Sequence, residues 1–224
     1  MDGIKSKERV KKHGEVFTPD SIVNDMLDLV DNKLNKDDLW KYIDTTYLEP
    51  SCGNGNFLVR ILDRKLNAVQ KLPKEQRELG LIRALSSIYA IDIQGDNVSE
   101  SKKRIINLIE SGTTDLLELS TEEKIKFNFE KMQLSNKIRE IVNKILDNNI
   151  LEGNGITGMK YKDGVEQVSP LVITEYIWDN SKVTMILHEF NNLDINLSKF
   201  ENIEYTSLMD YNTEYSDEAN MDDF

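Results

Sequence analysis

A glycine-rich string between a predicted strand and a predicted helix constrains the fold of this chain more than any other feature. Residues 45–49 are β-prone, residues 57–70 carry apolar side chains at helical spacing, and the string EPSCGNGNF (residues 49–57) joins them. Two glycines one residue apart allow a tight turn and let a ligand approach the backbone without meeting a Cβ atom. Glu49, at the end of the strand, is placed to accept hydrogen bonds from a cationic amine. A plain strand-to-helix turn with two convenient glycines is the alternative.

A second predicted strand ends in an acidic side chain. The compact apolar run at residues 87–93 is typical of a strand buried on both faces, and Asp92 closes it. In doubly wound sheets an acid at this position reaches ribose hydroxyls, because ligands bind beyond the carboxyl ends of the strands. Asp92 lies 39 residues after Gly53, against about 20 in the dinucleotide fingerprint. A helical stretch at residues 72–84 accounts for the extra length. An ordinary strand-end aspartate is the alternative.

Strand and helix patterns alternate through the first two thirds of the chain. A third buried strand is predicted at residues 150–154. Further helices, either amphipathic or rich in charged residues, are predicted at residues 20–35, 97–110 and 122–147. This alternation predicts an α/β fold built around a mostly parallel sheet.

The residue composition of the sequence changes after residue 170. Residues 171–178 and 182–190 are dominated by β-branched and aromatic side chains, and Asp179-Asn180-Ser181 between them is a turn signal. This pattern predicts a β-hairpin. The residues that follow are polar, acidic and without periodicity, so we expect them to be loosely ordered.

Charge is distributed unevenly along the chain. The 28 Lys and Arg residues against 40 Asp and Glu give a formal net charge of −12, which disfavours a nucleic-acid surface. Eight of the acids lie in residues 201–224, which contain no Lys or Arg, and five basic residues lie in residues 1–12. The chain therefore combines a basic arm, a body closer to charge balance and an acidic tail.

Cysteine and histidine usage excludes several kinds of site. The single cysteine, Cys52, cannot form a disulfide framework or a thiolate metal site, and two histidines without clustered carboxylates make a poor case for metal. No apolar run reaches the roughly 18 residues that span a membrane. We therefore expect a cytoplasmic protein without a metal ion and without a membrane partner.

Three motifs in one order carry a resemblance to a known family. HGEVFTP (residues 13–19) precedes an amphipathic helix, EPSCGNGNF follows, and YAIDI (residues 89–93) comes third. The order is similar to the N-terminal, S-adenosylmethionine-binding part of adenine-N6 DNA methyltransferases of bacterial restriction–modification systems and bacteriophages. The similarity continues more loosely through residues 145–158. It implies a Rossmann-like methyltransferase fold with an N-terminal helical lid, S-adenosylmethionine as cofactor, and a bacterial or phage-infected cell as the setting.

The resemblance implies roles for residues at matching positions. Glu49 would face the amino group of the cofactor, Asp92 would hold its ribose hydroxyls, and Ile93 would pack on its adenine ring. Asn154 lies where the family often has a polar side chain near the exocyclic amine of the adenine. The remaining positions implied at the cofactor are the lid residues Phe17, Thr18 and Pro19 and, within the glycine-rich string, Pro50, Gly53, Gly55 and Phe57.

The residues also discriminate between two nucleotide-like cofactors. S-adenosylmethionine has a ribose and an α-amino acid but no phosphate, which suits a chain without a phosphate-binding lysine loop. A dinucleotide such as NAD favours Gly-x-Gly-x-x-Gly, and here Leu58 stands at the third position. The sequence therefore favours S-adenosylmethionine over NAD.

The chain departs from the family at the catalytic motif. The family transfers the methyl group through an Asn/Asp-Pro-Pro-Tyr/Phe loop, and no two of the four prolines in this chain are adjacent. We therefore expect DNA methylation to require a partner protein that supplies this loop and reads the bases. The alternatives are a non-catalytic cofactor-binding or decoy (anti-restriction) module, and an interaction protein whose site has decayed.

The expected organisation has four parts. Residues 1–35 form a basic arm and a helix that covers the cofactor, and residues 36–160 form the Rossmann-like cofactor-binding domain. Residues 161–200 form a β-hairpin extension, and residues 201–224 form an acidic, flexible tail.

Overall fold

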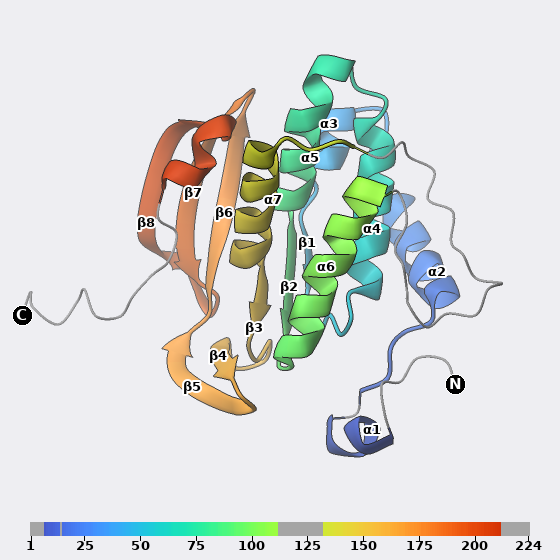
Figure 1. The fold of residues 1–224 in the computed structure, drawn as a ribbon, viewed down its shortest axis with the longest axis vertical. Helices are drawn as coiled ribbons and strands as arrows, with labels where there is room; N and C mark the ends of the chain where they lie inside the picture. The colour runs from blue at the N-terminus through green and yellow to red at the C-terminus, as the bar shows by residue number, and fades with distance from the viewer. Residues whose placement is uncertain (1–6, 14, 112–131, 212–224) are drawn as a thin grey trace, which may run out of the picture.

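A parallel three-stranded sheet lies at the centre of the fold. The computed structural model describes residues 7–13, 15–111 and 132–211 (Figure 1). Strands β1 (Tyr47–Glu49), β2 (Ile88–Asp92) and β3 (Ile150–Glu152) pair in parallel in the order β1-β2-β3. Helices lie between consecutive strands along the chain, so the predicted α/β class is confirmed.

Four helices pack against the central strand of this sheet. Helices α4 (Asn56–Val69) and α5 (Arg77–Ser86) follow β1, and α6 (Gly95–Ser111) and α7 (Asn136–Asn149) follow β2. Strand β2 contacts all four, and α4 packs beside α6 while α5 packs beside α7 (Figure 1). Each helix buries one apolar face; in α4 it comprises, at helical spacing, Leu58, Leu62, Leu66 and Val69.

The two faces of β2 have different neighbours because successive side chains of a strand point to opposite faces. Ile88 and Ala90 belong to the main hydrophobic core together with the helices. Tyr89, on the other face, donates a hydrogen bond from its hydroxyl to the carbonyl of Thr174, at 2.8 Å. Residues from the C-terminal part of the chain therefore reach the face of the sheet that the main core does not use.

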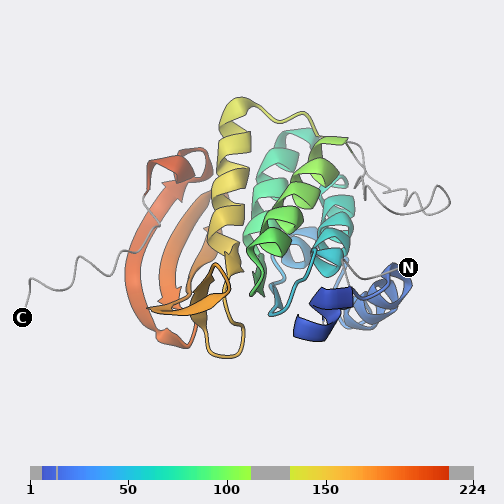
Figure 2. The same ribbon diagram turned by 60° about the horizontal axis from the view of Figure 1, so that its bottom comes forward.

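Antiparallel strands form the C-terminal part of the molecule. Strands β4 (Met159–Lys162) and β5 (Val165–Pro170) make a short hairpin, and β6 (Val172–Asp179), β7 (Lys182–Glu189) and β8 (Asn192–Glu204) make a second sheet (Figure 2). The β6–β7 hairpin confirms the one predicted from sequence.

The second sheet is attached to the helices through β6, which contacts α5 and α7. Trp178 donates its indole N–H to the Ser86 hydroxyl at 3.0 Å, and Asn148 donates to the Tyr176 hydroxyl at 3.1 Å. These bonds fix the sheet against the helical layer.

The expected organisation of the C-terminal part was wrong in two respects. Residues 161–200 are more than one hairpin, because β4–β5 and the third strand β8 add to the β6–β7 pair. Residues 201–211 are not loosely ordered: they complete β8 and form the 3-10 helix η2 (Tyr205–Asp210). The reason is that Ile203 pairs with Val183 of β7, and Leu208 is buried in the core. Residues 212–224 lie outside the described residues.

The predicted helix at residues 122–147 also differs from the structure. Helix α7 starts at Asn136, where the Ser135 hydroxyl accepts the N–H of Ile138 as an N-cap. Residues 132–135 are not helical, and residues 122–131 lie outside the described part of the chain. The serine is a helix start signal that helical periodicity alone does not reveal.

Three helices precede the sheet: α1 (Lys7–His13), α2 (Asp20–Asp31) and α3 (Leu39–Ile43). Helix α2 packs on α4 through Val23 and Leu27, which are buried. Within the described ranges, no helix is long and apolar enough to cross a membrane.

A buried lysine ties the N-terminal end of the sheet to the helices. Lys65 of α4 is 1% exposed, and its ammonium group donates to the carbonyls of Ile43 (2.5 Å) and Thr45 (2.6 Å) and to the Ser87 hydroxyl (2.7 Å). These three acceptors end α3, precede β1 and precede β2. Burial lowers the pKa of Lys65 to about 7.

We expect Lys65→Met to lower the free energy of unfolding and to change its pH dependence. The loss at pH 9 should be about 1–3 kcal/mol, because the buried amine is neutral at that pH and still donates its two N–H groups to these acceptors. Between pH 7 and pH 9 the unfolded chain binds more protons at Lys65 than the folded chain, so this residue makes stability rise with pH. Urea unfolding at pH 7, 8 and 9 should show that the variant lacks this contribution.

Lys71→Met is the matched control, because Lys71 is exposed at the end of the same helical segment. It should change stability by less than about 0.5 kcal/mol. Equal pH slopes for the wild type and Lys65→Met would contradict the assignment.

Candidate functional site

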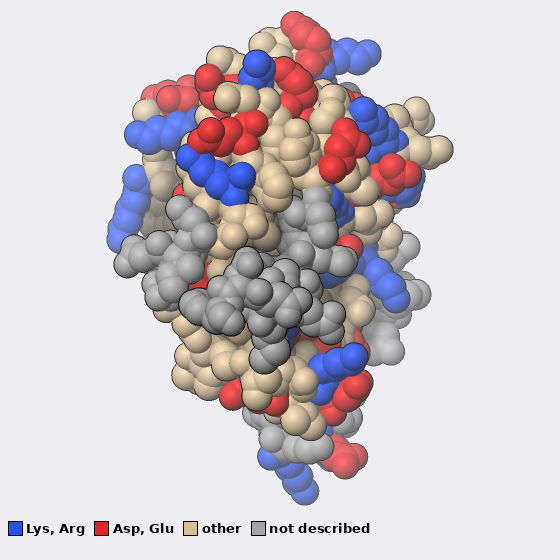
Figure 3. All heavy atoms as spheres, turned by 90° about the vertical axis from the view of Figure 1, so that its left-hand side faces the viewer, with Lys and Arg blue, Asp and Glu red and all other residues tan. Residues whose placement is uncertain are grey.

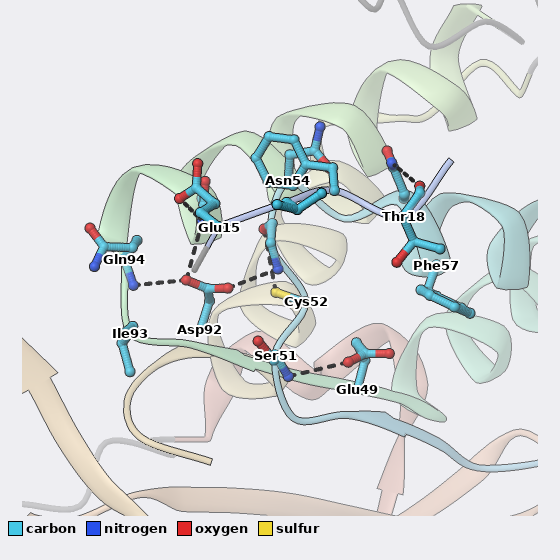
Figure 4. Close-up of a pocket in the computed structure, with 15 residues that line it drawn as sticks. Glu15, Thr18, Glu49, Ser51, Cys52, Asn54, Phe57, Asp92, Ile93 and Gln94 are labelled. Carbon is cyan, nitrogen blue, oxygen red and sulfur yellow. Dashed lines mark hydrogen bonds between the residues drawn. The ribbon is translucent and has the colours of Figure 1, made fainter. Parts of the chain in front are cut away.

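A pocket of about 200 Å³ opens at the carboxyl ends of β1 and β2. It lies between the turn that follows β1, the start of α6 and the segment that leads into α2 (Figure 4). Fifteen residues line it: Glu15, Val16, Phe17, Thr18, Glu49, Ser51, Cys52, Gly53, Asn54, Asn56, Phe57, Asp92, Ile93, Gln94 and Asn97.

The turn after β1 needs its glycines for backbone conformation and for packing. Gly53 and Gly55 have φ values of 53° and 85°, in the left-handed region that favours glycine. A Cβ atom on Gly55 would lie 2.7 Å from the hydroxyl oxygen of Ser101 in α6. The same hydroxyl donates to the carbonyl of Gly53 at 3.1 Å. The glycines therefore let α6 pack directly against the turn.

Asp92 joins the turn to the start of α6. One of its carboxylate oxygens accepts the backbone N–H of Gly53 at 2.8 Å, and the other accepts the backbone N–H of Gln94 at 2.8 Å. The side-chain amide of Asn97 donates to that second oxygen at 3.3 Å. Asp92 is 7% exposed but still lines the pocket. A carboxylate has about four lone-pair sites, so these bonds leave capacity for a ligand hydroxyl.

Glu49 lies at the end of β1, on the other strand that faces the pocket. Its carboxylate accepts the backbone N–H of Ser51 at 3.2 Å (Figure 4). Burial raises the pKa of Glu49, the Ser51 bond opposes this, and the nearby Asp92 carboxylate raises it further. A cationic group bound beside Glu49 would relieve this unfavourable environment, because it stabilises the charged carboxylate.

Residues 15–19 cross the pocket as a lid that is held at both ends. At one end Arg9 of α1 forms ion pairs with Glu15 and, at 2.6 Å, with Asp96 in the first turn of α6. At the other end the side-chain amide of Asn56 donates to the Thr18 carbonyl at 2.9 Å.

Between these ends the Phe17 ring lies against the glycine turn. A Cβ atom on Gly53 would be 3.0 Å from two of its ring carbons. The glycine thus provides the space in which the lid packs, in addition to its backbone role.

The structure brings together seven of the eleven residues that the sequence suggested for a site. The seven that line this one pocket are Phe17, Thr18, Glu49, Gly53, Phe57, Asp92 and Ile93. Pro19, Pro50 and Gly55 are neighbours of lining residues in the chain but do not line the pocket themselves.

Asn154 requires a correction, because it does not line the pocket. Its side-chain oxygen accepts the backbone N–H groups of Ile156 (2.9 Å) and Thr157 (3.3 Å), and its amide donates to Glu166 at 2.7 Å. Through these bonds the Asn154 side chain stabilises a local turn before the β4–β5 hairpin. Such turns are a common use of asparagine.

Sequence reasoning missed several polar residues of the pocket. Glu15 lies inside the HGEVFTP string, while Gln94 and Asn97 follow β2 directly. The rule that ligands meet residues just beyond the carboxyl ends of parallel strands points to the latter two. No comparable signal marks Asn54, whose side chain lines the pocket from the glycine turn.

The lining residues give the pocket a consistent electrostatic character. Glu15, Glu49 and Asp92 contribute three carboxyl groups, and the described lining contains no Lys or Arg. Burial raises the pKa of Cys52 to about 12, so its thiol stays protonated and is no nucleophile at neutral pH. Such a pocket favours ligands with amine or hydroxyl groups and disfavours phosphates.

Comparison of the chain with protein-family models, with curated proteins and with solved structures found no match. Among the residues that the structure describes, no three His, Cys, Asp or Glu side chains are grouped so that they could hold a metal ion. The functional interpretation rests on the sequence and on the geometry of the pocket.

We expect Gly55→Ala to destabilise the protein through both strain and overlap. Alanine in the left-handed region costs about 1–2 kcal/mol, and overlap with Ser101 adds about 1–3 kcal/mol. Gly164→Ala is the matched control, since Gly164 has a φ of 79° but no atom within 4 Å of the added Cβ position. Urea unfolding measures both variants, and an equal loss of stability in the two would show that α6 does not press on the turn.

Proposed function

We propose that the chain binds S-adenosylmethionine in this pocket and is related in function to adenine-N6 DNA methyltransferases of restriction–modification systems or bacteriophages. The observation that carries the proposal is a described lining with three carboxyl groups and no Lys or Arg, in which Glu15 is ion-paired with Arg9 from outside the lining. S-adenosylmethionine carries a sulfonium, an ammonium, one carboxylate and two ribose hydroxyls, but no phosphate. Its two cationic groups and its hydroxyl donors complement this lining, whereas the pyrophosphate of NAD does not.

Each end of the ligand has a proposed set of contacts. Glu49 would accept hydrogen bonds from the ammonium group, and Asp92 would accept a hydrogen bond from a ribose hydroxyl at its remaining lone-pair site. Ile93 would pack on the adenine ring, and Phe17 and Thr18 would cover the methionine end. The arrangement matches the general placement of ligands at the carboxyl ends of parallel strands.

The pocket is small, so binding of the whole ligand would require part of the protein to move. Its volume of about 200 Å³ is below the roughly 300–1,000 Å³ of typical small-molecule sites. Residues 15–19 would therefore shift outward to admit the whole ligand and close over it. The ion pairs of Arg9 with Glu15 and Asp96 are the bonds that such a movement would affect first.

The proposal also includes the fold family of the chain. The strand order β1-β2-β3, the glycine turn after β1 and the acid at the end of β2 support a Rossmann-like methyltransferase fold. When bound, S-adenosylmethionine supplies an electrophilic methyl group on its sulfonium. The residues of this chain would bind and orient it.

Methyl transfer to DNA would need a second protein. The chain lacks adjacent prolines and therefore the Asn/Asp-Pro-Pro-Tyr loop that accepts the target amine in the family. On the face seen in Figure 3, the Lys and Arg side chains visible around the undescribed residues alternate with Asp and Glu and form no continuous positive patch among themselves. The partner would supply both the loop and the DNA-reading surface.

A non-catalytic role is the second candidate. The same absence of the catalytic tetrapeptide, with 40 acidic against 28 basic residues, is compatible with a cofactor-binding decoy that occupies a modification or restriction complex. This candidate predicts S-adenosylmethionine binding without methyl transfer in any combination of proteins.

Calorimetry with S-adenosylmethionine tests the proposed ligand. Glu49→Gln should weaken binding about 10–100-fold, because a hydrogen bond to a charged group contributes about 1.5–3 kcal/mol. Asp92→Asn should weaken it at least as much, and urea unfolding of this variant measures how far the turn itself is disturbed. Glu140→Gln is the control, since Glu140 is exposed on α7 and outside the pocket.

Two results would contradict the proposed ligand. One is the absence of binding by S-adenosylmethionine to the wild-type protein. The other is binding of NAD with equal or higher affinity, because a lining with three carboxyl groups and no Lys or Arg disfavours phosphates. Unchanged affinity in Asp92→Asn would refute the ribose assignment alone.

A methyl-transfer assay on duplex DNA separates the two functional candidates. The chain alone should transfer no radiolabelled methyl group, and addition of the proteins encoded by neighbouring genes should restore transfer to adenine. Transfer by the chain alone would show that the catalytic loop is dispensable. No transfer in any combination would support the non-catalytic role.

A further inference from the structure

The two ends of the lid are held by different kinds of interaction. Figure 4 shows Glu15 and Thr18 at opposite sides of the pocket. On the Thr18 side, the amide of Asn56 donates to the Thr18 carbonyl at 2.9 Å. The chain then continues into α2, which packs on α4 through the buried side chains of Val23 and Leu27. Apolar packing therefore supports this end of the lid.

The Glu15 end of the lid is held by charge. Arg9 of α1 donates its Nε–H to the Glu15 carboxylate, at 2.9 and 2.8 Å from the two oxygens, and its Nη1–H to Asp96 at 2.6 Å. Its Nη2–H groups donate to both carboxylates. Asn97 of α6 adds a hydrogen bond from its amide to Glu15 at 3.2 Å. One guanidinium thus joins a carboxylate of the lid to a carboxylate in the first turn of α6.

These ion pairs at the Glu15 end lie within reach of solvent. The side chains of Arg9 and Asp96 are 24% and 52% exposed. None of the α1 residues whose side chains are described is buried, and none belongs to the main hydrophobic core. Dissolved salt screens charge pairs that reach the surface in this way. The hold on this end of the lid therefore depends on ionic strength.

The difference between the two ends decides which of them moves when the pocket opens. Opening at the Thr18 end would pull on α2 and on its buried side chains. Opening at the Glu15 end exchanges solvent-accessible ion pairs for water and moves the Phe17 ring away from Gly53. The second movement exposes less apolar surface and costs less free energy. The Thr18 end is therefore the hinge of the lid, and the Glu15 end is its free edge.

We propose that Arg9 is the latch of the pocket: its ion pairs with Glu15 and Asp96 hold the lid closed, and their breakage sets the rate at which a ligand enters and leaves. Arg9 does not line the pocket, so it acts on the lid and not on the ligand. It therefore slows entry and exit alike and changes affinity little. For ligand exchange the inference rests on the proposed function, whereas the movement of the lid requires no ligand.

The single cysteine of the chain reports lid opening without a ligand. Cys52 lines the pocket and is 7% exposed. At low ionic strength, alkylation by N-ethylmaleimide should be roughly three- to tenfold faster in Arg9→Gln than in the wild type, because two ion pairs are lost. Raising sodium chloride from about 50 mM to about 500 mM should accelerate the wild type and should not accelerate the variant. Mass spectrometry measures the rates, and hydrogen exchange at residues 15–18 should change in the same order.

Two further variants make the comparison specific. Lys102→Gln is the matched control, because Lys102 of α6 is also 24% exposed and forms an ion pair, at 2.7 Å with Asp147, outside the lining of the pocket. It should behave as the wild type. Asp96→Asn removes the outer half of the latch and leaves the pair of Arg9 with Glu15, so its alkylation rate should be intermediate. Urea unfolding of each variant measures global stability, and Asp96→Asn keeps the test valid if Arg9→Gln is unstable.

Three results would overturn the latch. Equal alkylation rates in the wild type, Arg9→Gln and Asp96→Asn would show that the lid does not depend on these ion pairs. Equal acceleration by salt in the wild type and Arg9→Gln would show that salt acts elsewhere. Acceleration in Lys102→Gln as large as in Arg9→Gln would show that loss of any ion pair on α6 loosens the chain.

Stopped-flow binding of S-adenosylmethionine extends the test to ligand exchange. Association and dissociation rates should rise together in Arg9→Gln, so that the dissociation constant changes less than about threefold. Faster dissociation with unchanged association would show that Arg9 stabilises the bound ligand, and it would overturn the gating role. Absence of ligand binding to the wild type, together with the expected alkylation rates, would overturn the proposed function and support the latch.

Discussion

The carboxylate of Asp92 is the interaction on which the candidate site depends. It accepts backbone N–H groups from Gly53 in the turn after β1 and from Gln94 at the start of α6, and it belongs to β2. One buried side chain therefore joins the turn after β1 to the connection between β2 and α6, which lies 39 residues further along the chain. The glycines of the turn allow this alignment, because any Cβ at Gly55 would collide with α6. The pocket is the space left above these joined segments, so its shape follows from the Asp92 contacts.

The lid and the electrostatics of the pocket extend the same arrangement. Glu15, Glu49 and Asp92 bring three carboxyl groups to one small space, and Arg9, held by Glu15 and Asp96, anchors the lid from outside the lining. Burial raises the pKa of Glu49, so the surroundings of this carboxylate are unfavourable for its charge and a bound cation would be favourable. The lid leads directly into α2.

Much of the fold and part of the site could be predicted because their signals are local. Helical spacing in α4, the apolar run of β2 and the turn residues between β6 and β7 each reflect a short stretch of chain, and each prediction was confirmed. Glu49, Gly53 and Asp92 were found for the same reason, since they stand at strand ends. Residues 201–211 were misjudged because a long-range partner decides their structure: Ile203 gains a strand partner in β7. Asn154 makes local bonds within the turn before β4, which the resemblance did not indicate.

The amino-acid sequence by itself determined the α/β alternation, the glycine turn after β1 and the acidic ends of the first two strands. These features follow from side-chain periodicity and from backbone freedom, which act over a few residues. Only the tertiary structure decided that Glu15, Gln94 and Asn97 join the pocket, that Lys65 is buried among three oxygen acceptors, and that one side of α2 stays exposed. Burial and charge pairing depend on which distant segments come into contact, and only the packing of the whole chain decides those contacts.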